Sequence, residues 1–185
     1  VTDHFATVSI CGPNSKKILN KLIPELDLSD KNFPHMSFKE APIGKIECRV
    51  MRISFTGELS YEINIQANYG ESLWEQCMEA GEEFNITPYG TETMHLLRAE
   101  KGFIIVGQDT DGTMTPIDLQ MDWIVSKKKY DFIGKRSLYR SDTIREDRKQ
   151  LVGLITENPK EILEEGAQIV LDLSLIHISE PTRRS

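Results

Sequence analysis

Residues 45–65 of the chain read Lys-Ile-Glu-Cys-Arg-Val-Met-Arg-Ile-Ser-Phe-Thr-Gly-Glu-Leu-Ser-Tyr-Glu-Ile-Asn-Ile. Apolar and polar side chains alternate at both ends of this stretch, with the period of two that is typical of a half-buried strand. Residues 56–58 between the two ends have turn composition. The stretch therefore predicts two strands joined by a turn, with Glu62 on the opposite face from Tyr61.

Helix patterns flank this hairpin. Residues 6–11 have strand composition, and Pro13 after them suits the first position of a helix because its missing N–H would be unpaired there. A second helix is predicted over Glu71–Ala80, and its spacing places Trp74 in the core. Residues 24–42 show no sustained period, so we expect an irregular connection there.

The segment Tyr89–Pro116 combines a helix pattern, a glycine stop, an apolar run and an acidic turn. Gly102 is placed to end the helix in the left-handed conformation, and Phe103–Val106 has the composition of a strand. Gly107 and Gly112 have the offset of a phosphate-binding loop, but the Lys and Ser/Thr of such a loop do not follow. The acidic turn lacks the further oxygen ligands of a calcium loop, so neither a nucleotide site nor a metal site is predicted.

The composition excludes several classes of protein. With 29 acidic and 22 basic residues among 185, the net charge is −7, which disfavours binding to the phosphate backbone of nucleic acid. The three cysteines are odd in number and lie in apolar segments, which favours reduced thiols in a cytoplasmic protein. No apolar run reaches membrane-spanning length. We therefore expect a cytoplasmic globular protein that binds neither nucleic acid nor a membrane.

Several motifs, taken together and in order, resemble one known family. These motifs are Gly12-Pro13, Arg52–Glu62, Leu73-Trp74, Tyr89–Pro116 and Asp131–Lys135. They are similar to the aminomethyltransferase family, which includes the glycine-cleavage T-protein, dimethylglycine dehydrogenase and the C-terminal folate-binding region of heterotetrameric sarcosine oxidase alpha subunits. The likeness to the sarcosine oxidase region is close and covers roughly residues 1–170 in unbroken order.

This resemblance implies an α+β fold in which helices pack on an antiparallel sheet. We expect residues 1–144 to form an aminomethyltransferase-like folate-binding domain that is truncated at its N-terminus. Residues 145–172 are then the start of a truncated C-terminal β-barrel, with Leu151–Ile155 as its first strand. Residues 173–183 look like the translation of a sequencing adaptor, so residues 173–185 are expected to be a non-native tail.

The resemblance also implies which residues bind the ligand. In the family, an aromatic residue, usually Tyr, and a Glu seven positions later contact the pterin ring of folate, and here they correspond to Phe55 and Glu62. A carboxylate can accept two parallel hydrogen bonds from a pterin, while an aromatic ring packs on its face. Arg98 corresponds to a family arginine close to the folate site. On pattern alone, a solvated strand carboxylate is the simpler interpretation of Glu62, and a helix C-terminal cation is the alternative for Arg98.

The function implied by the resemblance is that of a fragment of a sarcosine oxidase alpha subunit. In the intact enzyme this region binds tetrahydrofolate and helps to transfer the one-carbon unit of oxidised sarcosine, giving 5,10-methylenetetrahydrofolate. NAD, FAD and FMN are expected only in the intact heterotetramer, whose other subunits are the expected protein partners. The family's proposed catalytic Asp lies upstream of the position equivalent to Val1, so no catalytic residue is predicted here and the isolated fragment is expected to be inactive.

Two alternatives remain open at this point. One is a related enzyme domain, from a glycine-cleavage aminomethyltransferase or a dimethylglycine dehydrogenase. The other belongs to a different class and is a non-catalytic folate-binding or subunit-assembly module. An upstream dinucleotide-binding fingerprint would favour sarcosine oxidase over the stand-alone transferase.

Overall fold

The computed structural model of the chain describes residues 2–163, 169–171 and 174–176. The chain divides into two compact units, Val1–Phe103 and Ile104–Ser185. The strands of the first unit are β1 (Phe5–Cys11), β2 (Phe38–Ile43), β3 (Ile46–Met51) and β4 (Ser60–Gln66), and its helices are α1 (Ser15–Leu22), α2 (Gly70–Gly81) and α3 (Thr91–Glu100). The strands described in the second unit are β5 (Ile169–Leu171) and β6 (Ser174–Ile176). Short 3-10 helices lie at Thr2–His4, Ala67–Tyr69, Glu82–Phe84, Asp122–Ile124 and Lys135–Tyr139.

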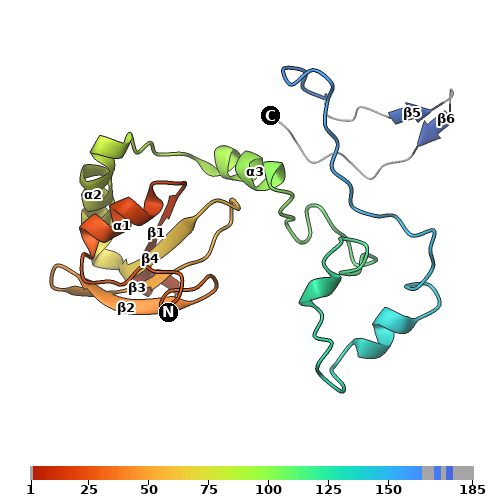
Figure 1. Cartoon of the computed structure of the whole chain (residues 1–185), viewed down its shortest axis with the longest axis horizontal. Coiled ribbons are helices and arrows are strands. Elements are labelled where there is room, and N and C mark those ends of the chain that lie inside the picture. Colours follow the sequence, from red (N-terminus) through yellow and green to blue (C-terminus); the bar gives the residue numbers. More distant parts are fainter. Residues whose placement is uncertain (1, 164–168, 172–173, 177–185) are drawn as a thin grey trace. The chain divides into compact units, whose positions relative to one another are not determined.

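The first unit is built on a four-stranded antiparallel sheet with the order β1-β4-β3-β2 (Figure 1). The predicted hairpin is confirmed, since β3 and β4 pair antiparallel and place Met51 opposite Glu62. Gly57 in the loop between them has φ of +79°, which a residue with a Cβ rarely adopts. The central position of β4 lets it pair with β3 on one side and with β1 on the other.

One face of this sheet carries the hydrophobic core. Along β4, Tyr61, Ile63 and Ile65 are buried and alternate with less buried polar residues, as the period-two pattern predicts. Helices α1 and α2 cover this face and contribute Leu19, Leu73 and other apolar residues (Figure 1). The buried members of the core are Ile10, Ile18, Leu19, Ile23, Leu28, Phe33, Ile43, Cys48, Val50, Tyr61, Ile63, Ile65, Leu73 and Cys77.

Two details of the helices differ from the prediction. Helix α1 begins at Ser15, after a turn that contains Pro13, because the Ser15 hydroxyl and the Gly12 amide both donate to the Leu59 carbonyl (3.0 and 2.9 Å) and fix the chain there. Trp74 is 47% exposed, so the prediction that it lies in the core is wrong. Its neighbour Leu73 takes the inward position instead, since adjacent helical residues point about 100° apart.

Two strand assignments are also corrected. Residues 38–43, within the stretch expected to be irregular, form β2, because Gly44 turns the chain back and lets β2 pair with β3. Phe103–Val106 was predicted to be a strand but consists of turns and irregular backbone, and no described strand pairs with it. The predicted helix stop just before it is confirmed, since Gly102 has φ of +72°.

The C-terminal part of the prediction is not confirmed. The structure has no strand at Leu151–Ile155, where the Leu151 amide donates instead to the Asp118 carbonyl (2.8 Å). The strand pair of β5 and β6 lies further along the chain. Most of the expected adaptor tail, residues 173 and 177–185, falls outside the described residues, and the domain boundaries at 144 and 172 stay predictions.

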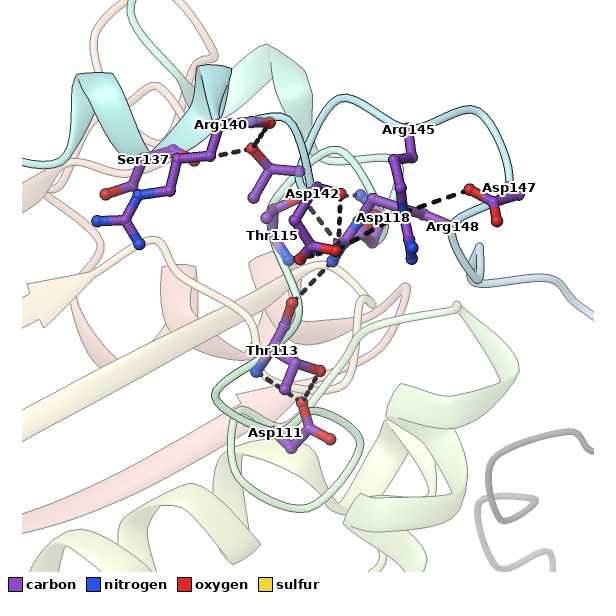
Figure 2. A network of polar contacts seen from close by, with 11 residues as sticks. Asp111, Thr113, Thr115, Asp118, Ser137, Arg140, Asp142, Arg145, Asp147 and Arg148 are labelled. Carbon is purple, nitrogen blue, oxygen red and sulfur yellow. Dashed lines mark hydrogen bonds and ion pairs between the residues drawn. The ribbon is translucent and has the colours of Figure 1, made fainter.

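A polar network connects distant parts of the second unit (Figure 2). Arg148 donates to both carboxylate oxygens of Asp118, at 2.8 and 2.6 Å, and also to the Thr113 carbonyl (2.7 Å). The backbone and hydroxyl of Thr115 donate to the same carboxylate, at 2.8 and 2.9 Å. Asp118 is 1% exposed, whereas every member of the described hydrophobic core belongs to the first unit. Among the described residues, the hydrogen bonds to Asp118 are therefore the main interactions that hold the second unit together.

A pair of substitutions in α2 tests the assignment of the core. Leu73→Ala removes a side chain with no exposed surface and is expected to lower the free energy of unfolding by about 2 to 5 kcal/mol. Trp74→Ala, one position away and half exposed, should cost clearly less despite removing a larger side chain. Chemical denaturation followed by circular dichroism measures both, and an equal or larger loss for Trp74→Ala would contradict the observed orientation of α2.

The Asp118–Arg148 pair predicts a pH dependence of the second unit. Arg148 beside Asp118 lowers the pKa of that carboxyl from 3.8 to about 2. Because the folded-state pKa is the lower one, the stabilisation is complete above about pH 4 and is lost as the pH falls through about 2. Carbon-13 NMR titration of the Asp118 carboxyl should give this low pKa, and amide exchange at Thr115 should accelerate over the same range.

The matched substitutions are Asp118→Asn and Asp147→Asn. Asp118→Asn leaves Arg148 without its buried partner. It should lower the free energy of local opening, measured by amide exchange, by about 3 to 5 kcal/mol. Asp147 pairs with Arg145 at 3.4 Å but is 78% exposed, so its replacement should cost about 0 to 1 kcal/mol. An Asp118 carboxyl that titrated near 4 would show that this ion pair does not form in solution.

Candidate functional site

Glu62 lies on the face of the sheet that α1 and α2 leave uncovered. It is half-buried and directly opposite Ser9 of β1, so both side chains project from this open face. Its neighbours two residues away along β4 are Ser60 and Asn64. The alternation predicted from the sequence is therefore correct, and Glu62 belongs to a polar surface backed by the core. It is more enclosed than a simple solvated strand carboxylate.

Polar side chains of β1 and β4 form two hydrogen-bonded pairs next to Glu62, and together they are called the polar group here. The hydroxyls of Ser9 and Ser60 are 3.2 Å apart, and the Thr7 hydroxyl donates to the Asn64 side-chain oxygen (2.9 Å). The buried Asn64 Nδ2 has no hydrogen-bond partner within the described residues. Unsatisfied buried polar groups cost free energy unless a ligand or water completes them, so this face fits a ligand with hydrogen-bonding edges.

Tyr89 joins this polar group from the segment just before α3. The Cys11 thiol donates to its phenol oxygen (3.1 Å). Burial and the hydrogen bond with Cys11 raise the pKa of Tyr89 above its ordinary value, with a smaller contribution from the charge of Glu62, so the phenol stays protonated at neutral pH. The phenol is therefore fixed against β1, on the face of the sheet that carries Glu62, with its proton retained.

Phe55 lies in the loop between β3 and β4, where its ring is 43% exposed. It makes an edge-on contact with His95 of α3, with ring centroids 6.2 Å apart and an interplanar angle of 79°. The same loop is tied to the end of α3 by an ion pair between Glu58 and Lys101 (3.0 Å). The loop and α3 thus hold Phe55 beside His95, with part of the residue exposed.

The absence of a side chain at Gly57 lets the loop between β3 and β4 approach Lys101 closely. A Cβ at Gly57 would lie 2.6 Å from Cγ of Lys101, closer than real Cβ atoms approach. Its φ of +79° independently favours glycine. Gly57 therefore sets how closely the loop approaches α3.

Arg98 occupies the last turn of α3 and is 4% exposed. Its Nη1 donates to the Phe103 carbonyl (3.0 Å), while the Phe103 amide donates to the Arg98 carbonyl (2.9 Å). These two hydrogen bonds close the end of the helix. This agrees with the alternative interpretation of Arg98 as a cation at a helix C-terminus. Its contact with folate stays a prediction.

The structure brings the three predicted residues onto neighbouring elements of the first unit. Phe55 touches α3, the helix that carries Arg98, through His95. Glu62 is linked to the start of the same helix through Tyr89, which immediately precedes the N-cap residue Gly90.

Sequence reasoning assigned no ligand role to Tyr89 or Cys11 and gave His95 a structural role. The sequence could have indicated part of this group, because the alternation of β1 places Ser9 and Cys11 on the same face as Glu62. The partner of Cys11 could not be identified in this way, since Tyr89 lies 78 residues further along the chain.

The described part of the chain has neither a metal-binding cluster nor a membrane-spanning helix. Residues 2–163, 169–171 and 174–176 contain no group of three His, Cys, Asp or Glu side chains placed to hold a metal ion. Among the helices that the structure describes, none combines the length and the apolar character needed to cross a membrane.

Comparison with known proteins gives close relatives of the chain. The sarcosine oxidase subunit alpha of Corynebacterium sp. (strain P-1) is 56% identical over 173 residues, which are 93% of the chain and 18% of that protein. The aminomethyltransferase of Halothermothrix orenii is 34% identical over 139 residues, 75% of the chain and 38% of that protein. Mouse mitochondrial dimethylglycine dehydrogenase is 35% identical over 144 residues, 77% of the chain and 16% of that protein. The chain thus spans less than a fifth of the sarcosine oxidase subunit that it matches.

The GCVT N-terminal domain family matches residues 1–129, more than half of the chain. The resemblance inferred from the ordered motifs is thereby confirmed, and the antiparallel sheet with its packed helices agrees with the expected α+β fold. On this match, the chain belongs to the GCVT N-terminal domain family.

Proposed function

We propose that the chain is the tetrahydrofolate-binding region of a sarcosine oxidase alpha subunit. In the complete enzyme this region takes part in passing the one-carbon unit of oxidised sarcosine to tetrahydrofolate, which gives 5,10-methylenetetrahydrofolate. The observation that carries the proposal is the half-buried Glu62 carboxylate on the open face of a sheet, the face on which Cys11 holds the Tyr89 phenol. The 56% identity to a sarcosine oxidase alpha subunit favours this enzyme over its relatives.

Each predicted residue has a chemical role in this proposal. The Glu62 carboxylate accepts two parallel hydrogen bonds from the 2-amino group and the adjacent ring N–H of the pterin. The exposed part of the Phe55 ring stacks on the pterin face, without the hydroxyl that a Tyr would add there. Arg98 lies close to the ligand and also secures the end of α3 through the Phe103 carbonyl.

The folate itself supplies the nitrogen atoms that take up the one-carbon unit, so the chain contributes binding, orientation and exclusion of water. We assign no catalytic residue to the chain. The other subunits of the heterotetramer are its proposed partners, and NAD, FAD and FMN are proposed to be bound by other parts of the complete enzyme. A cytoplasmic location belongs to the same proposal.

The second candidate is the same folate site in a related enzyme. It is favoured by the 34% identity to an aminomethyltransferase and the 35% identity to a dimethylglycine dehydrogenase. A candidate of another class is a folate-binding or assembly module without turnover. Assay of the complete polypeptide with sarcosine, dimethylglycine and the aminomethyl carrier protein of glycine cleavage as alternative donors separates these candidates.

Replacement of the carboxylate at the centre of the site tests the proposal. Glu62→Gln exchanges a charged acceptor for a neutral amide and should weaken tetrahydrofolate binding by about 1.5 to 3 kcal/mol, roughly 10- to 150-fold. Isothermal titration calorimetry on the complete polypeptide that contains this sequence measures the change. Glu47→Gln is the matched control, because Glu47 is an exposed carboxylate on strand β3 of the same sheet. Equal affinities of Glu62→Gln and the parent protein would refute the assignment.

A further inference from the structure

Tyr89 is a phenol that hydrogen-bonds Cys11 on the face of the sheet that carries Glu62. It reaches this face from outside the sheet, as the residue before the N-cap of α3, and contacts β1 through Cys11. Its side chain keeps contact with solvent, since 38% of the residue is exposed. The hydroxyl therefore lies where the polar face of the sheet meets the space available to a ligand.

The Tyr89 phenol oxygen is a hydrogen-bond acceptor, since the Cys11 thiol donates to it (3.1 Å). A phenol oxygen that accepts in this way still has its own proton to donate. No hydrogen bond between Tyr89 and Glu62 is found among the described residues. The register of β1 and β4 places Cys11 on the same face of the sheet as Glu62, so the Tyr89 proton is available on the face that carries the carboxylate acceptor.

A donor next to a carboxylate matches one edge of a pterin. That edge presents the 2-amino group, the N3–H and the 4-oxo oxygen in a row, which is two donors followed by one acceptor. Glu62 can accept from the two donors, which leaves the 4-oxo oxygen in need of a donor. An unpaired carbonyl oxygen in a water-poor site costs free energy, so a fixed donor at this position increases both affinity and selectivity.

We propose that Tyr89 is a specificity-determining residue of the folate site, whose phenol O–H hydrogen-bonds the 4-oxo oxygen of the pterin while Glu62 accepts from the neighbouring N–H groups. This inference rests on the proposed folate function and adds a residue to it. Cys11 acts as a positioning residue, because its hydrogen bond orients the Tyr89 hydroxyl.

The test compares two ligands that differ at positions 3 and 4 of the pterin. Tetrahydrofolate carries the N3–H donor and the 4-oxo acceptor, whereas its 4-amino-4-deoxy analogue has an unprotonated N3 and a 4-amino donor that cannot accept the Tyr89 proton. Tyr89→Phe should weaken tetrahydrofolate binding about five- to tenfold, the effect of one lost neutral hydrogen bond. The same substitution should leave the affinity for the 4-amino analogue unchanged within about twofold. Calorimetry on the complete polypeptide measures all four affinities.

The two-ligand design separates recognition from a structural effect. A loss of equal size for both ligands would mean that Tyr89 only supports the fold, and no loss for tetrahydrofolate would mean that it makes no contact. Either result overturns the inference. The control is Tyr130→Phe, which removes a phenol hydroxyl from a residue that is 96% exposed in the second unit and should change neither affinity.

The inference can also fail separately from the proposed function. If Glu62→Gln weakens tetrahydrofolate binding while Tyr89→Phe does not, the folate site stands and the role of Tyr89 is refuted. If the unchanged polypeptide binds neither ligand, both the proposed function and the role of Tyr89 are refuted.

Discussion

The structure of the first unit depends on one constraint, which is that its sheet buries only one face. Strand β4 is central and directs Tyr61, Ile63 and Ile65 into the core under α1 and α2, so the residues between them must project from the other face. A register shift of one residue would place Glu62 in the core, where an unpaired carboxylate is very costly. The same burial that stabilises the domain therefore fixes Glu62, Ser60 and Asn64 on the open face.

A second constraint is that α3 is connected to the rest of the first unit by contacts near both of its ends. Tyr89 anchors the start of the helix to Cys11, and Lys101 after its end pairs with Glu58. Gly57 permits the close approach at that end, since a Cβ there would clash with the Lys101 side chain. The candidate residues thus lie on a strand of the sheet, on the loop after β3 and on a helix connected to both near its ends.

The sequence predicted the parts of the fold that show a regular period and missed those set by long-range pairing. The β3–β4 hairpin, the face of Glu62 and the stop at Gly102 all follow from local patterns. Strand β2 shows little alternation and exists through its pairing with β3, whereas Phe103–Val106 has strand composition but no partner. Phe55, Glu62 and Arg98 were named from family likeness, while the contact of Tyr89 spans 78 residues and has no local signal.

The central claim is that a pterin lies on the open face of the sheet against Glu62. A crystal structure of the complete polypeptide with tetrahydrofolate tests this claim most directly. The account predicts both Glu62 carboxylate oxygens within about 2.7 to 3.2 Å of the 2-amino group and N3 of the pterin. A pterin bound elsewhere, with the Glu62 carboxylate facing only solvent, would contradict it.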